Sequence, residues 1–266
     1  MKKVLFTITV LLLVAAFGIS AFLVGSYLWE GKQQAEKYDN LAEIKNNAQS
    51  AKPNQPEETV PGETRETVAQ VRDENGMLLC YKEIYEMNND TVGWIKMEGT
   101  EIDYPVMQTP DEVNYYLYKD FEKNKSDRGC LYAWEAADIN EPSDNITIFG
   151  HNMRDGSMFA ALNAYTDKAA WDKNSLIFFD TLNEFHTYKI FAVFKTSASV
   201  GKGFSYHQFV DAEDEEEFDK FVAKCKDLAF YDTGITPVYG DKLICLSTCE
   251  YTLENGRLVV AAVRIT

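Results

Sequence analysis

The sequence is poor in the residues that build metal and redox sites. It contains three histidines and five cysteines, and none of the cysteines forms a CxxC pair. Cys245 and Cys249 are four positions apart but have no matching cluster of histidine or cysteine, which argues against a structural zinc site. Because five is an odd number, at least one thiol is left without a partner in the chain. We expect no metal and no cofactor.

Positive charge is also scarce. Lysine and arginine together number 26 against 42 aspartates and glutamates, which gives a formal net charge of −16. An acidic surface repels phosphate backbones, so nucleic acid is not expected as a partner. A hydrophobic content of 45% still allows a globular domain with a sizeable core. The sequence shows no internal repeat.

The first 29 residues are typical of a membrane anchor. Two lysines precede an uncharged apolar run from residue 4 to about residue 28. Such a run is long enough to span a bilayer and longer than the apolar core of a cleavable signal peptide. Residues 1–29 are therefore predicted to be a signal anchor with its lysines in the cytoplasm and the rest of the chain outside. The alternative is a signal peptide cleaved near Ser20 or Gly25.

A polar segment separates this run from the rest of the chain. Residues 30–76 are dominated by Gln, Asn, Glu, Lys and Pro and cannot bury enough apolar surface to offset the entropy of ordering. We interpret them as an extracellular stalk, partly helical and then flexible. Residues 77–266 are predicted to form the ordered domain.

The ordered domain is predicted to be mainly β. Short apolar and β-branched runs, separated by turn residues, predict eight strands: 92–97, 102–107, 130–134, 145–150, 175–180, 186–196, 241–248 and 257–265. Helical periodicity predicts helices at 78–90 and 211–230. Many short strands with inserted helices favour a closed β-barrel.

Three side chains stand where catalytic groups often lie, at the ends of strands. Cys249 follows one predicted strand and Arg257 begins the next, so antiparallel pairing would bring them together. His151 follows the strand at 145–150. A thiolate stabilised by nearby cations is a nucleophile, histidine can exchange protons with an amine, and arginine can bind a developing oxyanion. Arg264, in the same strand as Arg257, is a rival for the cation.

Each of these residues also has an ordinary structural interpretation. Cys249 could be a core thiol at the end of a strand, because most cysteines are small buried hydrophobic residues. His151 could be a hydrogen-bonded loop residue, and Arg257 could be a solvated residue at the start of a strand. The residues alone leave these alternatives open.

Three segments together resemble the sortase family of cysteine transpeptidases. LSTCEYTLENGRLVVAAV, at 246–263, is similar to the family's nucleophile segment, its arginine and its last strand. GHNMRDGSMF, at 150–159, and YYLYKDFEKNKSDRGCLYAW, at 115–134, resemble class B members. The resemblance covers about residues 77–266. It implies a closed eight-stranded barrel with N-terminal helices and a long helix inserted before the nucleophile strand.

The resemblance also implies roles for individual residues. Cys249 would be the nucleophile, His151 the acid and base, and Arg257 the ligand of substrate and oxyanion. Ser247 and Thr248 would contact the substrate, and no metal is implied. Two positions depart from the family: Cys245 stands where a threonine is usual, and Tyr251 stands where some class B members have aspartate.

The implied activity is cleavage of a C-terminal sorting signal, of the LPxTG or NPxTN kind, on surface proteins. A thioester would form and be resolved by an amine of a cell-wall peptide or by a pilin lysine. The enzyme would be a single-pass protein of the plasma membrane with its catalytic domain outside. The alternatives are a non-catalytic anchored ectodomain that binds wall components or acts as a scaffold, and a cysteine peptidase that only hydrolyses. An L,D-transpeptidase would need an SHGC-like segment, which is absent.

Overall fold

The computed structural model of the protein describes residues 2–50, 71–199 and 201–266. The chain divides into two compact units, one ending at Glu43 and the other running from Ile44 to Thr266. The predicted stalk at 30–76 is therefore helical up to residue 50, and its segment 51–70 lies outside the described residues. The boundary predicted at residue 77 stays a prediction.

The first unit consists of a single helix, α1, which spans Lys2–Ser50 and continues into the second unit. Among the described residues it is the one helix long and apolar enough to cross a membrane. A signal sequence near the N-terminus passes the same test of length and composition. The helix is thus compatible with membrane anchoring, as the sequence predicts.

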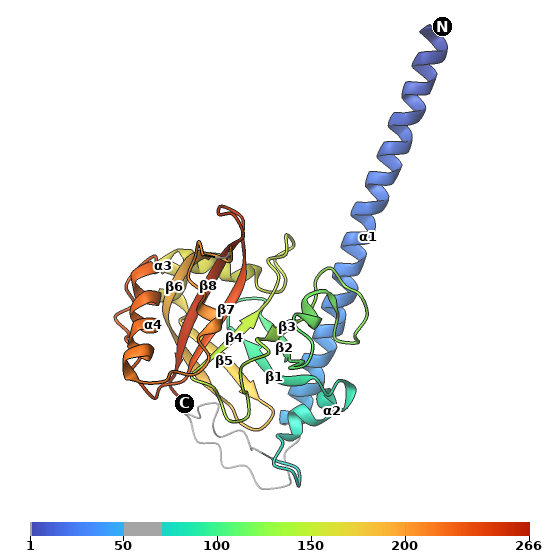
Figure 1. The fold of residues 1–266 in the computed structure, drawn as a ribbon. Helices are drawn as coiled ribbons and strands as arrows, with labels where there is room; N and C mark the ends of the chain where they lie inside the picture. Colours follow the sequence, from blue (N-terminus) through green and yellow to red (C-terminus); the bar gives the residue numbers. More distant parts are fainter. Residues whose placement is uncertain (1, 51–70, 200) are drawn as a thin grey trace. The chain divides into compact units, whose positions relative to one another are not determined.

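The second unit is built on a closed barrel whose strands follow the order β1-β2-β3-β4-β7-β8-β6-β5 (Figure 1). All eight predicted strands are present: β1 Thr91–Lys96, β2 Asp103–Met107, β3 Leu131–Ala133, β4 Asn145–Phe149, β5 Leu176–Thr181, β6 Thr187–Ser197, β7 Leu243–Glu250 and β8 Gly256–Arg264. β5 pairs with β1 and closes the barrel. The predicted mainly β architecture is confirmed.

Most neighbouring strands are antiparallel, but β2–β3 and β4–β7 are parallel. Parallel neighbours need a long connection, because the chain must return to the starting end of the barrel. Between β4 and β7 this connection contains β5, β6 and four helices: η3 Ala160–Thr166, α3 Lys168–Lys173, η4 Tyr206–Gln208 and α4 Glu215–Leu228. Two further helices precede β3, namely α2 Leu79–Met87 and η2 Tyr115–Tyr118.

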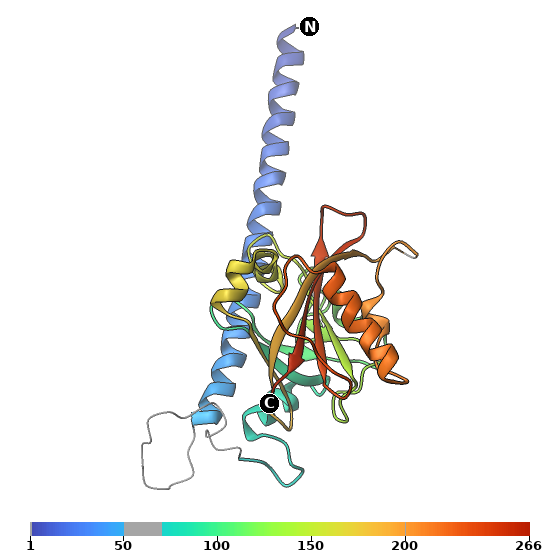
Figure 2. The ribbon, with the colours of Figure 1, turned by 90° about the vertical axis from the view of Figure 1, so that its left-hand side faces the viewer.

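Helix α4 covers the outside of the barrel (Figure 2). The sequence predicts a helix at 211–230, and the helix begins at Glu215 because the Asp214 carboxylate caps it by accepting from the Glu217 amide at 2.9 Å. One face of the helix is buried against β6, β7 and β8, and it consists of Phe218, Phe221, Val222 and Cys225. This apolar packing fixes the helix that precedes the Cys249 strand.

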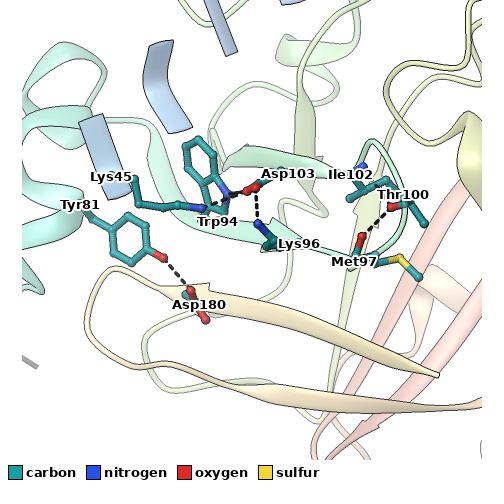
Figure 3. Close-up of polar contacts among 9 residues, drawn as sticks. All are labelled: Lys45, Tyr81, Trp94, Lys96, Met97, Thr100, Ile102, Asp103 and Asp180. Carbon is teal, nitrogen blue, oxygen red and sulfur yellow. Dashed lines mark hydrogen bonds and ion pairs between the residues drawn. The ribbon is translucent and has the colours of Figure 1, made fainter. Parts of the chain in front are cut away.

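A polar cluster joins residues 44–49 to the first hairpin of the barrel (Figure 3). We call it the β1–β2 cluster; its members are Lys45, Trp94, Lys96 and Asp103. The Lys45 ammonium lies 3.0 Å from the Asp103 carboxylate and 4.2 Å from the centre of the Trp94 ring. Lys96 pairs with the other Asp103 oxygen at 2.7 Å, and the Trp94 indole also donates to Asp103. Burial lowers the pKa of Lys45, although Asp103 opposes that change.

Candidate active site

The register of three strands brings the predicted site residues to one end of the barrel. β4 and β7 run parallel with Phe149 beside Ser247, so the chain leaves β4 towards His151 next to the end of β7 that carries Cys249. The Gly150 amide donates to the Ser247 carbonyl at 3.0 Å. On the other side of β7, Cys249 is the register partner of Arg257 in β8.

This end of the barrel is also where two loops project. The β7–β8 loop and the loop after β6 leave the same end, because Ser197 pairs with Gly256 (Figures 1 and 2). The C-terminus lies at the opposite end of the barrel. The candidate site therefore lies at a rim bordered by loops.

Cys249 is the cysteine that solvent can reach. It is half-buried, whereas the other four cysteines are buried. Burial raises the pKa of Cys80 to about 11 and raises the pKa values of Cys225 and Cys245 as well. A buried thiol with a raised pKa is a poor nucleophile. Exposure thus singles out the thiol that the sequence pattern also favours.

His151 is half-buried and is held by the η2 segment. Its Nε2 lies 2.8 Å from the backbone carbonyl oxygen of Leu117. The ring of Tyr118 packs beside it, with 5.7 Å between ring centroids. Two consecutive residues of one short helix therefore define where the imidazole lies.

Arg257 is half-buried at the start of β8. Its Nη1 donates to the carbonyl oxygens of Gly256 at 2.9 Å and Asn255 at 3.4 Å. In the described part of the chain these backbone oxygens, and no carboxylate, hold the guanidinium. Its positive charge acts on two neighbouring tyrosines. Burial raises the pKa of Tyr132 and of Tyr206, and the Arg257 charge opposes that rise.

The rival cation, Arg264, is at the opposite end of β8, where it pairs with Tyr188. There it acts on a different histidine: burial lowers the pKa of His186, and the Arg264 charge lowers it further. Arg264 lies seven positions beyond Arg257, which corresponds to roughly 23 Å along a strand, so it is too distant to share a peptide bond with Cys249.

The third histidine, His207, packs against aromatic residues of β4 and of the segment after β3. Its ring lies 4.9 Å from the Trp134 ring and 6.1 Å from the Phe149 ring, measured between centroids. Burial lowers its pKa, and the Arg257 charge lowers it further. A neutral aromatic histidine in this position contributes surface rather than charge. Among the described residues, no three histidine, cysteine or carboxylate side chains gather as a metal group would.

Ser247 and Thr248, the predicted substrate contacts, are both buried. The Ser247 hydroxyl is hydrogen-bonded to the Tyr206 hydroxyl at 2.5 Å. The Thr248 hydroxyl donates to the Gly150 carbonyl at 2.8 Å. Both side chains thus connect β7 to its surroundings, and their contact with substrate stays a prediction.

Asn152 was missed by the sequence analysis, although it stands in the GHNMRDGSMF segment. Its side-chain amide donates to the Cys249 carbonyl at 2.8 Å, which ties the loop after His151 to the cysteine strand. The Tyr251 hydroxyl donates to the Asn152 carbonyl at 3.3 Å. Tyr251 therefore supports the same loop.

Glu250 is the second residue that the sequence analysis missed. Its carboxylate accepts from the Lys195 ammonium at 2.8 Å and from the amides of Thr252 and Leu253 at 2.9 and 3.2 Å. Burial alone would raise its pKa, but the hydrogen bonds from Lys195 and Thr252 lower it to about 2. Glu250 thereby orders the β7–β8 loop between Cys249 and Arg257.

The Sortase domain family model matches residues 95–265, which include the end of β1, the other seven strands and all three site residues. The chain belongs to the sortase family. It is 28% identical to sortase B of Listeria monocytogenes over 96% of this chain and 95% of that protein. It is 27% identical to sortase B of Staphylococcus aureus over 68% of this chain and 73% of that protein.

Solved structures agree with this assignment. Sortase B of S. aureus covers 88% of this chain and 99% of its own, with 25% identity and a TM-score of 0.72. A sortase B from Bacillus anthracis covers 90% of this chain and 99% of its own, with 25% identity and a TM-score of 0.70. The predicted sortase fold and the predicted resemblance to class B members are confirmed. The chain is accordingly a sortase-type cysteine transpeptidase.

Proposed function

We propose that this sortase cleaves a C-terminal sorting signal on surface proteins and transfers the protein to an amine, using Cys249, His151 and Arg257. One observation carries the proposal. Register pairing in β4, β7 and β8 brings an accessible thiol, an imidazole and a guanidinium to the same end of the barrel. Together these groups supply a nucleophile, a proton carrier and an oxyanion ligand.

The first half-reaction forms a thioester. The Cys249 thiolate attacks the carbonyl carbon of the signal's threonine, and the carbonyl oxygen takes on negative charge. The amide C–N bond then breaks, and protonated His151 gives its proton to the departing amine. The amine product leaves, and the surface protein stays bound to Cys249 as an acyl group.

The second half-reaction reverses these roles. An amine attacks the thioester carbonyl and loses a proton to neutral His151. The C–S bond breaks, Cys249 departs as a thiolate and a new amide bond is made. A thioester suits this step because it reacts readily with amines, whereas the oxygen ester of a serine enzyme is less reactive towards them.

Arg257 serves both half-reactions. A guanidinium keeps its charge at any relevant pH and offers several donors in a fixed plane. Nη1 is bonded to backbone oxygens, which fix the group while other N–H donors remain for the substrate carbonyl. The charge beside Cys249 also favours the thiolate over the thiol.

The partners follow from this chemistry. The donor substrate is a surface protein with an LPxTG-like or NPxTN-like signal, and the acceptor is a peptidoglycan peptide amine or a pilin lysine. Residues 1–29 anchor the enzyme in the plasma membrane, part of the segment 30–76 serves as the stalk, and residues 77–266 form the catalytic domain outside. Ser247 and Thr248, which precede Cys249 in β7, would contact the bound signal. The proposed chemistry uses no cofactor.

The proposal is tested with a fluorogenic sorting peptide, with and without an amine acceptor. The unmodified enzyme should cleave the peptide and yield a ligated product whose share rises with acceptor concentration. Cys249→Ala should lose both activities, whereas Cys80→Ala, which removes a buried thiol, should keep them. Cleavage retained in Cys249→Ala would exclude the proposed nucleophile.

Two other outcomes correspond to the alternatives. If the acyl group passes to water at every acceptor concentration, the chain is a peptidase rather than a transferase. If Cys249 reacts with iodoacetamide no faster than a model thiol and forms no acyl adduct, the domain binds or scaffolds without catalysis.

A further inference from the structure

The hydrogen bond that orients the imidazole of His151 is made to a backbone carbonyl. Nε2 lies 2.8 Å from the Leu117 oxygen. A carbonyl oxygen only accepts hydrogen bonds, so Nε2 must carry the hydrogen. The hydrogen bond made by one ring nitrogen determines the state of the other. Neutral His151 therefore keeps its basic lone pair on Nδ1.

The neighbouring carbonyls show why the Leu117 oxygen remains available. The Tyr116 oxygen accepts from the Cys130 amide at 3.0 Å, and the Tyr118 oxygen accepts from the Ser126 amide at 3.1 Å. The backbone amides of the returning segment, 126–130, thus bind the carbonyl groups on either side of Leu117. The Leu117 carbonyl between them accepts from His151.

The η2 segment is itself anchored firmly. Tyr116 is 1% exposed, and its hydroxyl donates to Asp90 at 2.7 Å and accepts from Asn88 at 2.8 Å. Buried, fully engaged polar groups of this kind make a rigid local structure. The carbonyl that faces His151 therefore has a fixed position.

Gly129 is the residue that lets the returning segment pass so close. Its φ is +57°, in the left-handed region, and a Cβ built on it would lie 2.5 Å from the Leu117 oxygen and 2.6 Å from the Tyr116 oxygen. Any side chain at this position would push the Leu117 carbonyl away from its present place. Glycine is required here for space as well as for backbone conformation.

We propose that the Leu117 carbonyl, held in place by Gly129, is the positioning group of His151 and makes Nδ1 the nitrogen that exchanges protons during catalysis. This inference rests on the proposed role of His151. Because the acceptor of this hydrogen bond is a backbone oxygen, no side-chain substitution at Leu117 removes it.

The first test is spectroscopic and does not depend on turnover. Two-bond ¹H–¹⁵N spectra of the Cys249→Ala protein distinguish the protonated from the unprotonated ring nitrogen of neutral His151. We expect the hydrogen on Nε2. A neutral ring with its hydrogen on Nδ1 would overturn the inference, whereas the proposed nucleophile would be unaffected by either result.

The second test compares two glycine substitutions. Gly129→Ala should mix the two ring tautomers, lower kcat roughly tenfold or more with KM changed less than about twofold, and shift the pH profile of kcat. Gly240→Ala is the matched control, since Gly240 also has a positive φ of +96° but has open space around its Cβ position. The control should keep kcat within about twofold.

Two results of the second test would contradict the inference. One is a folded Gly129→Ala protein with an unchanged tautomer and an unchanged pH profile. The other is an equal loss of kcat in both variants, which would show that backbone strain alone accounts for the effect. If Gly129→Ala does not fold, the spectrum of the Cys249→Ala protein still decides the question.

Discussion

The β1–β2 cluster and the candidate active site hold their charged groups in different ways. In the cluster, opposite charges pair with one another: the Asp103 carboxylate accepts from the ammonium groups of Lys45 and Lys96, and the Lys45 side chain is only 3% exposed (Figure 3). Charges used in this way are committed to each other. Such a cluster contributes to structure.

At the candidate site, backbone groups hold the reactive side chains. The Leu117 carbonyl binds His151, the Gly256 carbonyl binds Arg257, and Asn152 binds the carbonyl of Cys249 rather than its thiol. Backbone contacts fix position without neutralising charge. The difference indicates that the rim is organised for chemistry, and the cluster for stability.

The largest effect is expected from a change at Arg257. Arg257→Lys should lower kcat/KM by about 10²- to 10³-fold, because a point charge cannot reproduce the planar donors that bind an oxyanion. Arg264→Lys is the matched control at the other end of the same strand and should stay within about twofold. Steady-state kinetics with a sorting peptide measure both. Equal losses in the two variants would remove the distinction between them.

A smaller effect is expected from loosening the loop between Cys249 and Arg257. Glu250→Gln keeps the shape of the side chain but weakens its bonds to Lys195 and to the loop amides. We expect kcat/KM to fall roughly tenfold and stability to fall by about 1–3 kcal/mol. Kinetics and urea unfolding check the two effects. Glu254→Gln, which changes an exposed ion pair with Lys202, is the control and should alter neither quantity measurably.

In the β1–β2 cluster, we expect a substitution to lower stability and to leave activity nearly unchanged. Asp103→Asn leaves the buried Lys45 ammonium without its counter-charge, so the free energy of unfolding should fall by about 2–4 kcal/mol. kcat should change by less than about twofold, since no reactive group is involved. A large loss of kcat in a stable Asp103→Asn protein would show that the cluster and the site are coupled.

The contribution of the same cluster to stability should depend on pH in the acid range. Burial alone would raise the pKa of Asp103, but Lys45 and Lys96 bring it below its usual value. Its stabilising contribution is therefore complete above the unfolded pKa of about 3.9 and is lost as the pH falls through the lower folded value. Stability measured against pH should fall less steeply below about pH 4 in Asp103→Asn than in the unmodified protein. Identical slopes would contradict this account.

Much of this fold could be predicted from the sequence because its signals are local. Alternating apolar residues identify the strands, and helical periodicity with an acidic first turn identifies α4. The proximity of Cys249 and Arg257 also followed, because an antiparallel hairpin joins neighbouring strands. His151 could be placed at a strand end but not beside Cys249, because the parallel β4–β7 pairing spans about a hundred residues.

The contacts that position the site could not be predicted in the same way. Leu117 acts through its backbone carbonyl, which every residue possesses, so its identity carries no signal. Gly129 was visible as a glycine, but its closeness to that carbonyl depends on how the returning segment packs. Lys45 lies in a polar stretch whose composition suggested a stalk, and only its burial against Trp94 shows that residue 45 belongs to the barrel unit.

The central claim is that one thiol at the barrel rim attacks a peptide carbonyl. Intact-protein and peptide mass spectrometry test it most directly, after the enzyme has reacted with a sorting peptide in the absence of an amine acceptor. We predict a mass increase equal to the acyl part of the peptide, located on Cys249 and lost when triglycine is added. An adduct on another residue, or the same adduct in Cys249→Ala, would contradict the account.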